Sequence, residues 1–290
     1  VIGKAYGTAY VAMNSKSVGA DLVYAWDNAE IGMMDASLAA KIMYPGGQAM
    51  NFSVYAKMLG AQSAYLGVFG KDRVAEHIIS VLDEIGVDHS RCRQYAGENG
   101  YAKVRLENGD RQFIMSNRGG IVNEHPLDLK PEDISYIREF SLVHTSNNGH
   151  FDSQLKKVRE TGIPVSYDFS GHWNEEYYLK EIAPVVDYAF FSCGEIDEET
   201  AKAACKRFVS EGCKIAVATM GKRGSLAFDG KKYYRQIPKP VDAIDTLGAG
   251  DSFTTAFLLS LLDGEKIETA MEKGAEFAAK TCMVRGAFGY

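Results

Sequence analysis

The stretch that decides the fold is Asp245-Thr246-Leu247-Gly248-Ala249-Gly250-Asp251-Ser252-Phe253. Two glycines flank Ala249, an acid follows them, and the chain then stays largely apolar as far as Leu262. This pattern predicts a tight glycine turn that opens a buried helix over 251–262. The first N–H groups of a helix have no partner within the helix and lie at the positive end of its dipole. The turn therefore offers a site for an anion, and phosphate is the usual one.

Asp251 is an unexpected neighbour for an anion, because its carboxylate would repel a bound phosphate. The arrangement makes chemical sense if Asp251 accepts a proton from an attacking hydroxyl group while the N–H groups of the turn hold the charge that develops on phosphate. The alternative is a helix cap, since Asp is a preferred capping residue. Gly-Ala-Gly-Asp alone favours the cap, whereas the nine residues together favour catalysis.

Composition limits the classes of protein to consider. A chain of 290 residues can bury a sizeable core, and its net charge of −6 argues against a nucleic-acid binder. No apolar run approaches the roughly 18 residues of a membrane span, and no secretory signal is visible. The five cysteines are scattered, which indicates reduced thiols and neither a disulfide framework nor a zinc site. We expect a cytoplasmic protein without nucleic-acid or membrane partners.

The order of elements predicts an α/β fold. Helices are expected over 49–59 and 74–85, each ended by a glycine, with a strand over 64–70 between them. After Pro131 strands and helices alternate again. The expected strands are 141–145, 164–168, 188–191 and 215–219, a hairpin joins 225–228 to 231–235, and the expected helices are 151–161, 173–182, 198–211 and 267–284. We predict a doubly wound, mainly parallel sheet flanked by helices, in a single domain over 1–290.

Residues 99–116 have a different pattern. Two short apolar runs, 101–106 and 112–115, flank Asn108-Gly109, which is a strong hairpin signal. This hairpin and strands from residues 8–45 would make a small sheet apart from the main one. A surface hairpin without a role is the alternative.

Two further motifs place polar groups next to glycines. In Gly46-Gly47-Gln48-Ala49-Met50-Asn51 the glycines allow the backbone to approach a polyol closely, and Asn51 can donate and accept hydrogen bonds. In Thr219-Met220-Gly221-Lys222-Arg223-Gly224 two glycines and two cations follow a strand, which suits the phosphates of a nucleotide. A turn before a helix and a solvated turn are the respective alternatives.

The nine-residue stretch resembles the C-terminal signature of the ribokinase-like carbohydrate kinases, the PfkB family. The resemblance implies that Asp251 is the catalytic base and that Gly248, Ala249 and Gly250 form the anion hole. The spacing Gly-Gly-x-Ala-x-Asn is similar to the sugar-binding signature of the family, which assigns Gly46, Gly47 and Asn51 to the substrate. Gln48 takes a position that varies with the substrate. The family also implies a β-sheet lid, here at about 8–45 and 98–118, and pairing through such a lid would make a homodimer.

The resemblance further implies ATP and Mg²⁺. Thr219, Gly221 and Gly224 match a nucleotide-binding run, and they would bind ATP together with Gly248 and Gly250. Ser192-Cys193-Gly194-Glu195 is similar to a family Asn-x-x-Glu run that organises Mg²⁺ through water, with Ser192 in place of Asn. Since Mg²⁺ needs few protein ligands, that change is tolerable. A helix start enriched in acids is the alternative.

The roles of two further acids, and the replacement of a third by alanine, stay open. Asp245 corresponds to a place where the family often holds a monovalent cation such as K⁺, but it could simply anchor the turn. Asp168, at a strand end, would face phosphate or substrate, or only cap a helix. The family usually has an Asp at the end of its first strand, and here Ala12 takes that place.

The second half of the chain is most similar to the fructoselysine 6-kinases, through residues 167–173, 233–253 and 278–281. On that resemblance Asn147, Asn148, His144 and His150 would line the substrate side, and ordinary loop residues are the alternative. We expect an ATP-dependent kinase that transfers the γ-phosphoryl group to a hydroxyl of a sugar or a fructoselysine-like sugar-amine. The alternatives are another sugar or nucleoside kinase, and a non-catalytic sugar-binding descendant.

Overall fold

The computed structural model describes residues 4–6, 30–32, 47–107 and 110–289. The chain divides into two units, Val1–Tyr44 and Pro45–Tyr290. In the first unit, strands β1 (Lys4–Tyr6) and β2 (Glu30–Gly32) pair in parallel. Ala12, Gly46 and most of the lid segment expected at 8–45 lie outside the described residues. The single domain over 1–290 stays a prediction.

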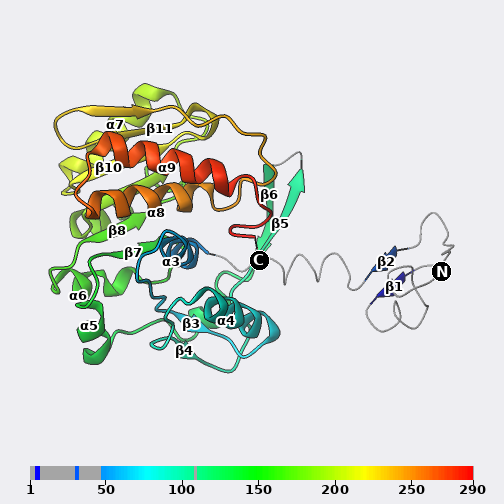
Figure 1. The fold of residues 1–290 in the computed structure, drawn as a ribbon. Helices are drawn as coiled ribbons and strands as arrows, with labels where there is room; N and C mark the ends of the chain where they lie inside the picture. The colour runs from blue at the N-terminus through cyan, green and yellow to red at the C-terminus, as the bar shows by residue number, and fades with distance from the viewer. Residues whose placement is uncertain (1–3, 7–29, 33–46, 108–109, 290) are drawn as a thin grey trace. The chain divides into compact units, whose positions relative to one another are not determined.

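The second unit is built on a six-stranded sheet in the order β12-β11-β10-β9-β8-β7 (Figure 1). Strands β7 to β10 are parallel, and β11 and β12 add an antiparallel edge. The strands are β7 (Val143–Ser146), β8 (Val165–Asp168), β9 (Tyr188–Ser192), β10 (Ile215–Thr219), β11 (Ser225–Phe228) and β12 (Tyr233–Gln236). The charge-free strand β10 lies inside the sheet, as its composition predicts.

Helices cover both faces of this sheet. Because β7 to β10 follow one another in chain order, right-handed crossovers put their connections on one face. Those connections include α6 (Leu155–Arg159) and α7 (Glu198–Ser210), while α3 (Gln48–Met58), α8 (Ala249–Leu262) and α9 (Ile267–Thr281) cover the other face (Figure 1). Neighbouring residues of β9 show the alternation, since Phe191 stacks on Phe208 of α7 and Phe190 contacts Phe257 of α8. The doubly wound prediction is confirmed.

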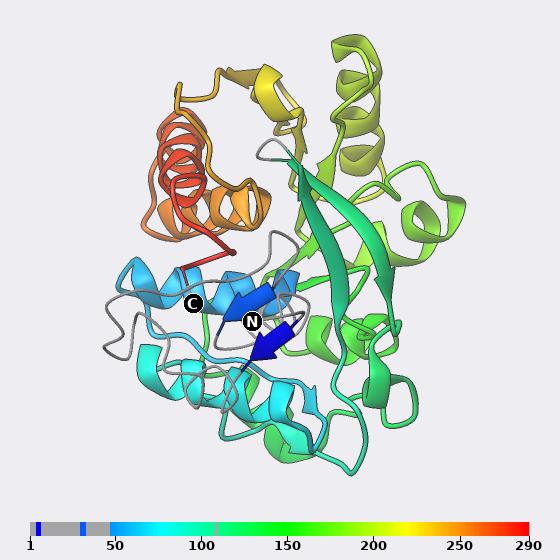
Figure 2. The same cartoon turned by 90° about the vertical axis from the view of Figure 1, so that its right-hand side faces the viewer.

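A smaller layer completes the unit. Helix α4 (Arg73–Ile85) packs with α3 and the two-residue strand β3 (Val68–Phe69), which pairs with β4 (Arg93–Gln94). The expected hairpin is present as β5 (Ala102–Glu107) and β6 (Asp110–Ser116). It forms a two-stranded sheet of its own, visible as the long pair of arrows in Figure 2. No helix in the described part of the chain is long and apolar enough to cross a membrane.

Some expected boundaries are wrong. The strand over 64–70 shrinks to β3, and Ala64 adds only a single bridge to Asp88. The helix over 151–161 is a 3-10 turn, Asp152–Gln154, followed by the short α6, because Gly162 at φ +81° turns the chain. The helix over 173–182 is a π-helical turn, Tyr178–Ile182, so Trp173 reaches the core from a loop.

Two further helices differ from the expectation. Helix α5 (Pro131–Ile137) is present although none was expected there, and it starts with Pro at its first position, where no N–H partner is lost. Helix α9 ends at Thr281, three residues before Val284. The remaining 3-10 turns are Gly120–Asn123, Ala183–Val185 and Gly221–Arg223.

Candidate active site

The glycine turn and its helix form as the nine-residue stretch predicts, although α8 begins at Ala249 and not at Asp251. Gly248 is the N-cap and has φ +76°, a conformation that side chains other than glycine rarely adopt. A Cβ atom added to it would lie 2.2 Å from the hydroxyl oxygen of Tyr55. Both the backbone conformation and the lack of space therefore require glycine at this position.

The N-terminus of α8 has the properties of an anion hole. The N–H groups of Gly250 and Asp251 have no hydrogen-bond partner within the described ranges. They belong to the first turn of a helix of 14 residues, where the dipole is positive. A phosphoryl oxygen held there would satisfy both donors.

Asp251 meets the second glycine motif directly. Its Oδ2 accepts a hydrogen bond of 2.5 Å from Nδ2 of Asn51, a residue that is 200 positions away in sequence. Asn51 is 3% exposed and sits in the first turn of α3, whose N-cap is Gly47 at φ +121°. The fold thus brings the residue assigned to the sugar and the residue assigned to proton abstraction into contact.

The end of β8 extends this site. Oδ2 of Asp168 accepts from Nε2 of Gln48 at 2.8 Å, and Oδ1 accepts from the backbone N–H of Ser170 at 2.7 Å. The same Gln48 nitrogen lies 2.7 Å from Oγ of Ser170, which donates to Oδ1 of Asn147 at 2.9 Å. Asn148 donates to Oε1 of Gln48 at 3.0 Å. The predicted residues Gln48, Asn51, Asn147 and Asp251 therefore line one site, joined by Asp168.

Both carboxyl groups in this site have raised pKa values. Burial and, to a smaller extent, the charge of Asp168 raise the pKa of Asp251 to about 7, against the opposing hydrogen bond from the Asn51 amide. Burial also raises the pKa of Asp168 to about 6, opposed by hydrogen bonds from Ser170 and Gln48. A carboxyl group with a pKa near neutrality is well matched to general base catalysis.

The second group of predicted residues lies at the ends of β9 and β10. Thr219 ends β10, and its carbonyl oxygen accepts from the Cys193 N–H at 2.7 Å. Gly224 has φ +87°, and a Cβ atom on it would lie 2.1 Å from the Gln236 carbonyl oxygen. The guanidinium of Arg223 donates to the carbonyl oxygens of Cys193 and Gly194 at 3.1 Å each. Arg223 thus fastens the loop after β9 to the turn after β10.

The candidate metal ligands differ in their surroundings. Glu195 is exposed in the loop that Arg223 holds. Within the described ranges no three His, Cys, Asp or Glu side chains cluster to hold a metal ion. A magnesium ion held through water by Glu195, as the resemblance implies, stays a prediction.

Asp245 is fully buried below the glycine turn. Its Oδ1 accepts from the Leu247 N–H at 3.0 Å, and its Oδ2 accepts from the Gly286 N–H at 2.9 Å. Asp245 therefore anchors the glycine turn to the C-terminal loop. A monovalent cation at this position stays a prediction.

The two histidines that the resemblance places on the substrate side have different surroundings, and their role stays a prediction. The ring of His144 stacks on Phe52 with centroids 4.2 Å apart, and burial lowers its pKa to about 3, so the ring is neutral. His150 is exposed at φ +50°. Ser170 was missed altogether, because its left-handed φ of +50° at the end of β8 has no signal in the sequence.

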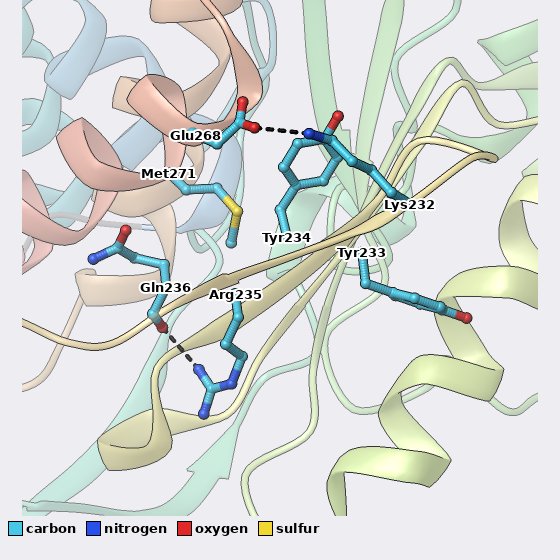
Figure 3. Close-up of a pocket in the computed structure, with 7 residues that line it drawn as sticks. All are labelled: Lys232, Tyr233, Tyr234, Arg235, Gln236, Glu268 and Met271. Carbon is cyan, nitrogen blue, oxygen red and sulfur yellow. Dashed lines mark hydrogen bonds and ion pairs between the residues drawn. The ribbon is translucent and has the colours of Figure 1, made fainter.

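A surface hollow lies elsewhere. It is lined by residues of β12 and α9, and within it Lys232 pairs with Glu268 at 2.9 Å (Figure 3). None of the predicted site residues contributes to it, so it is separate from the candidate active site. Its lining residues are Lys232, Tyr233, Tyr234, Arg235, Gln236, Glu268 and Met271.

The family model for the pfkB family carbohydrate kinases matches residues 17–288. The chain belongs to this family. It is therefore a carbohydrate kinase, and its helix α8 carries the signature that the sequence predicted.

Curated relatives and solved structures agree with this assignment. The chain is 42% identical over 248 residues to fructosamine kinase FrlD of Bacillus subtilis, which covers 85% of this chain and 87% of that protein. It is 31% identical to fructoselysine 6-kinase of Escherichia coli, covering 84% and 92%. The ribokinase of Arabidopsis thaliana, solved with ribose and ATP, has a TM-score of 0.73 at 24% identity and covers 84% of this chain and 83% of its own. That likeness shows the ribokinase-like fold.

Proposed function

We propose that this carbohydrate kinase transfers the γ-phosphoryl group of ATP to a hydroxyl of a sugar-amine, a fructosamine of the fructoselysine type. The observation that carries the proposal is the hydrogen bond between Asn51 and Asp251, which joins the sugar motif to the base at the mouth of an anion hole. The substrate class comes from the two relatives, one named a fructosamine kinase and the other a fructoselysine 6-kinase.

Each residue of the site has its own role in the proposed reaction. Asn51 and Gln48 orient the sugar through their amide groups, and Asp251 takes the proton of the attacking hydroxyl. The Gly250 and Asp251 N–H groups stabilise the negative charge on the transferred phosphoryl group. Catalysis of this kind rests on positioning and electrostatics. The hydroxyl oxygen forms the new P–O bond, and ADP leaves with the electron pair of the old one.

The residues present fit ATP. The unpartnered N–H groups of α8 suit its γ-phosphate, and the turn Gly221–Arg223 lies beside the loop of Glu195. Magnesium, when bound, would neutralise charge on the phosphates. Glu195, exposed and next to this turn, would hold its water ligands, and Thr219 and Gly224 would contact the nucleotide.

The hairpin of β5 and β6 is proposed as the part of the lid that covers the sugar. Its two strands form a sheet separate from the main one, as a movable cover requires. Closure would exclude water and limit ATP hydrolysis. The nearest rival function is a kinase for another sugar or for a nucleoside.

The test is ADP release from Mg-ATP with five acceptors: fructoselysine, a second fructosamine, fructose, ribose and adenosine. The proposal expects the highest kcat/KM with a fructosamine. Preferred turnover of ribose or adenosine would establish a different kinase. Binding of sugar without ADP release from any acceptor would establish a non-catalytic protein.

A further inference from the structure

The candidate site holds a second carboxylate, the partly buried Asp168, that the proton transfer does not need. Asp251 alone suffices as the base, yet Asp168 lies close enough for its charge to raise the pKa of Asp251. Gln48, Ser170, Asn147 and Asn148 surround Asp168 with amides and a hydroxyl, all of them neutral.

No cation of the described chain offsets this pair of acids. Neither carboxyl group has a Lys, Arg or His among the causes of its pKa shift or among its described hydrogen-bond partners. Two like charges in a buried site destabilise each other, and they would also repel the triphosphate that the reaction requires. A neutral sugar would supply hydroxyl donors but no charge to compensate them.

A second observation points to a donor that is missing from the free site. Asn51 is 3% exposed, its Nδ2 is committed to Asp251, and its Oδ1 is buried without a hydrogen-bond partner. A buried, unpaired acceptor is destabilising unless a ligand satisfies it. Apart from the backbone N–H groups that would hold phosphate, the open side-chain atoms next to Asp251 are therefore acceptors, and two of the groups there carry negative charge when ionised.

We propose that Asp168 is a specificity-determining residue that pairs with the ammonium nitrogen of a cationic sugar-amine substrate. The inference rests on the proposed function and names the residue that would distinguish a sugar-amine from a neutral sugar. An alkylated fructosamine carries a secondary ammonium at neutral pH, which has N–H donors and a positive charge. Fructose has the same ketose skeleton without that charge.

The experiment compares wild type, Asp168→Asn and Glu268→Gln. Asn at 168 keeps the shape and an acceptor for the Ser170 N–H while removing the charge. Glu268→Gln makes the same change of charge in the hollow of Figure 3, away from the candidate residues. For each enzyme we would measure KM for fructoselysine and the inhibition constant of fructose as a neutral competitor, at saturating Mg-ATP.

The expected result is a rise in KM for fructoselysine of about 10- to 100-fold in Asp168→Asn, the loss that one charged hydrogen bond would cause. The inhibition constant of fructose should stay within about threefold, because fructose has no positive charge to pair with the carboxylate and Asn keeps an acceptor for its hydroxyl groups. Glu268→Gln should match wild type in both values.

Other results would overturn the inference. An unchanged KM for fructoselysine in Asp168→Asn would show that the Asp168 carboxylate does not bind the ammonium group of the substrate. Equal weakening of both ligands would show a structural role, as would weakening of fructoselysine by Glu268→Gln. Wild type that turns over ribose or adenosine but no fructosamine would defeat the proposed function itself, which is a different failure.

Discussion

Asp251 is buried, lies near a second acid, Asp168, and belongs to the first turn of helix α8. Burial and the charge of Asp168 raise its pKa to about 7, so a large share of the free enzyme carries a protonated base just below neutral pH. A protonated carboxyl cannot accept the hydroxyl proton.

The pH dependence of the reaction should show this directly. We expect kcat/KM to fall about tenfold per pH unit below a midpoint near 7 and to be level above it, since this parameter reports groups of the free enzyme. In Asp168→Asn the midpoint should move to lower pH, because the like charge that raises the pKa is gone. A profile measured from pH 5 to 9 tests both statements, and an identical midpoint in the two enzymes would contradict the coupling.

The same carboxyl should lower the stability of the ligand-free protein. Its pKa is raised in the folded state, so the folded protein binds the proton more tightly than the unfolded chain does. The stability contributed by that proton is fully present near pH 4 and is lost as the pH rises through about 7.

Asp251→Asn removes this ionisation, and its melting temperature should exceed that of wild type by a few degrees at pH 8. The difference should shrink as the pH falls and vanish near pH 4. Thermal unfolding of both proteins across this range is the measurement. A variant that is less stable than wild type at every pH would show that burial of Asp251 is not destabilising.

Motifs selected single residues whose proximity the fold then shows. Gly248, Asn51 and Asp251 were chosen from their local sequences, and the structure brings the last two into contact, while their roles stay predictions. Asp168 was left between two interpretations, since a strand-ending Asp has no motif around it. Its importance comes from Gln48, 120 residues away, and such a contact is visible only in the folded chain.

At the level of elements, the turn before α8 depends on Gly248. Its φ of +76° and the Tyr55 hydroxyl 2.2 Å from a Cβ position leave no room for a side chain. Gly250 has neither restriction, because no atom lies within 4 Å of a Cβ position there.

Gly248→Ala should therefore destabilise the protein by about 1–3 kcal/mol and lower kcat, while Gly250→Ala should leave stability within about 0.5 kcal/mol of wild type. Urea unfolding measures the first quantity and ADP release the second. Equal stability of the two variants would show that the turn tolerates a side chain.

A second element-level prediction concerns Arg223, whose guanidinium holds the loop after β9 to the turn after β10. Arg223→Met should raise KM for ATP about fivefold, the equivalent of a hydrogen bond worth about 1 kcal/mol, and leave KM for the sugar unchanged. Lys222→Met is the matched control, because Lys222 is exposed on the same turn. If Lys222→Met gave the larger rise, direct attraction of phosphate by this turn would explain ATP binding better.

Elements with strong periodicity were predicted, and short or irregular ones were not. Strand β10 and helix α4 have clear apolar patterns and glycine or charge boundaries, and both formed as expected. The helix expected over 173–182 was wrong because the partly buried Trp173 packs on the core from a loop, which apolar periodicity cannot distinguish from a helix face. The strand expected over 64–70 was predicted too long, because its partner β4 is only two residues long.

At the scale of the whole molecule, the topology explains why distant motifs share one site. The parallel strands β7 to β10 end at the same edge of the sheet, where Asn147, Asp168, Glu195 and Thr219 follow in order. Ligands of open α/β sheets bind at this edge. Helices α3 and α8 bring Asn51 and Asp251 to the end of β8. Alternating strands and helices predicted the parallel sheet, while only the fold supplied these contacts.

The measurement that tests the central claim most directly is single-turnover ADP formation by wild type and Asp251→Asn with fructoselysine and Mg-ATP. The account predicts that the variant stays folded, binds the sugar with unchanged affinity and forms ADP about 10²- to 10⁴-fold more slowly, because general base catalysis is lost. Formation of ADP at the wild-type rate by the folded variant would show that Asp251 is not the base.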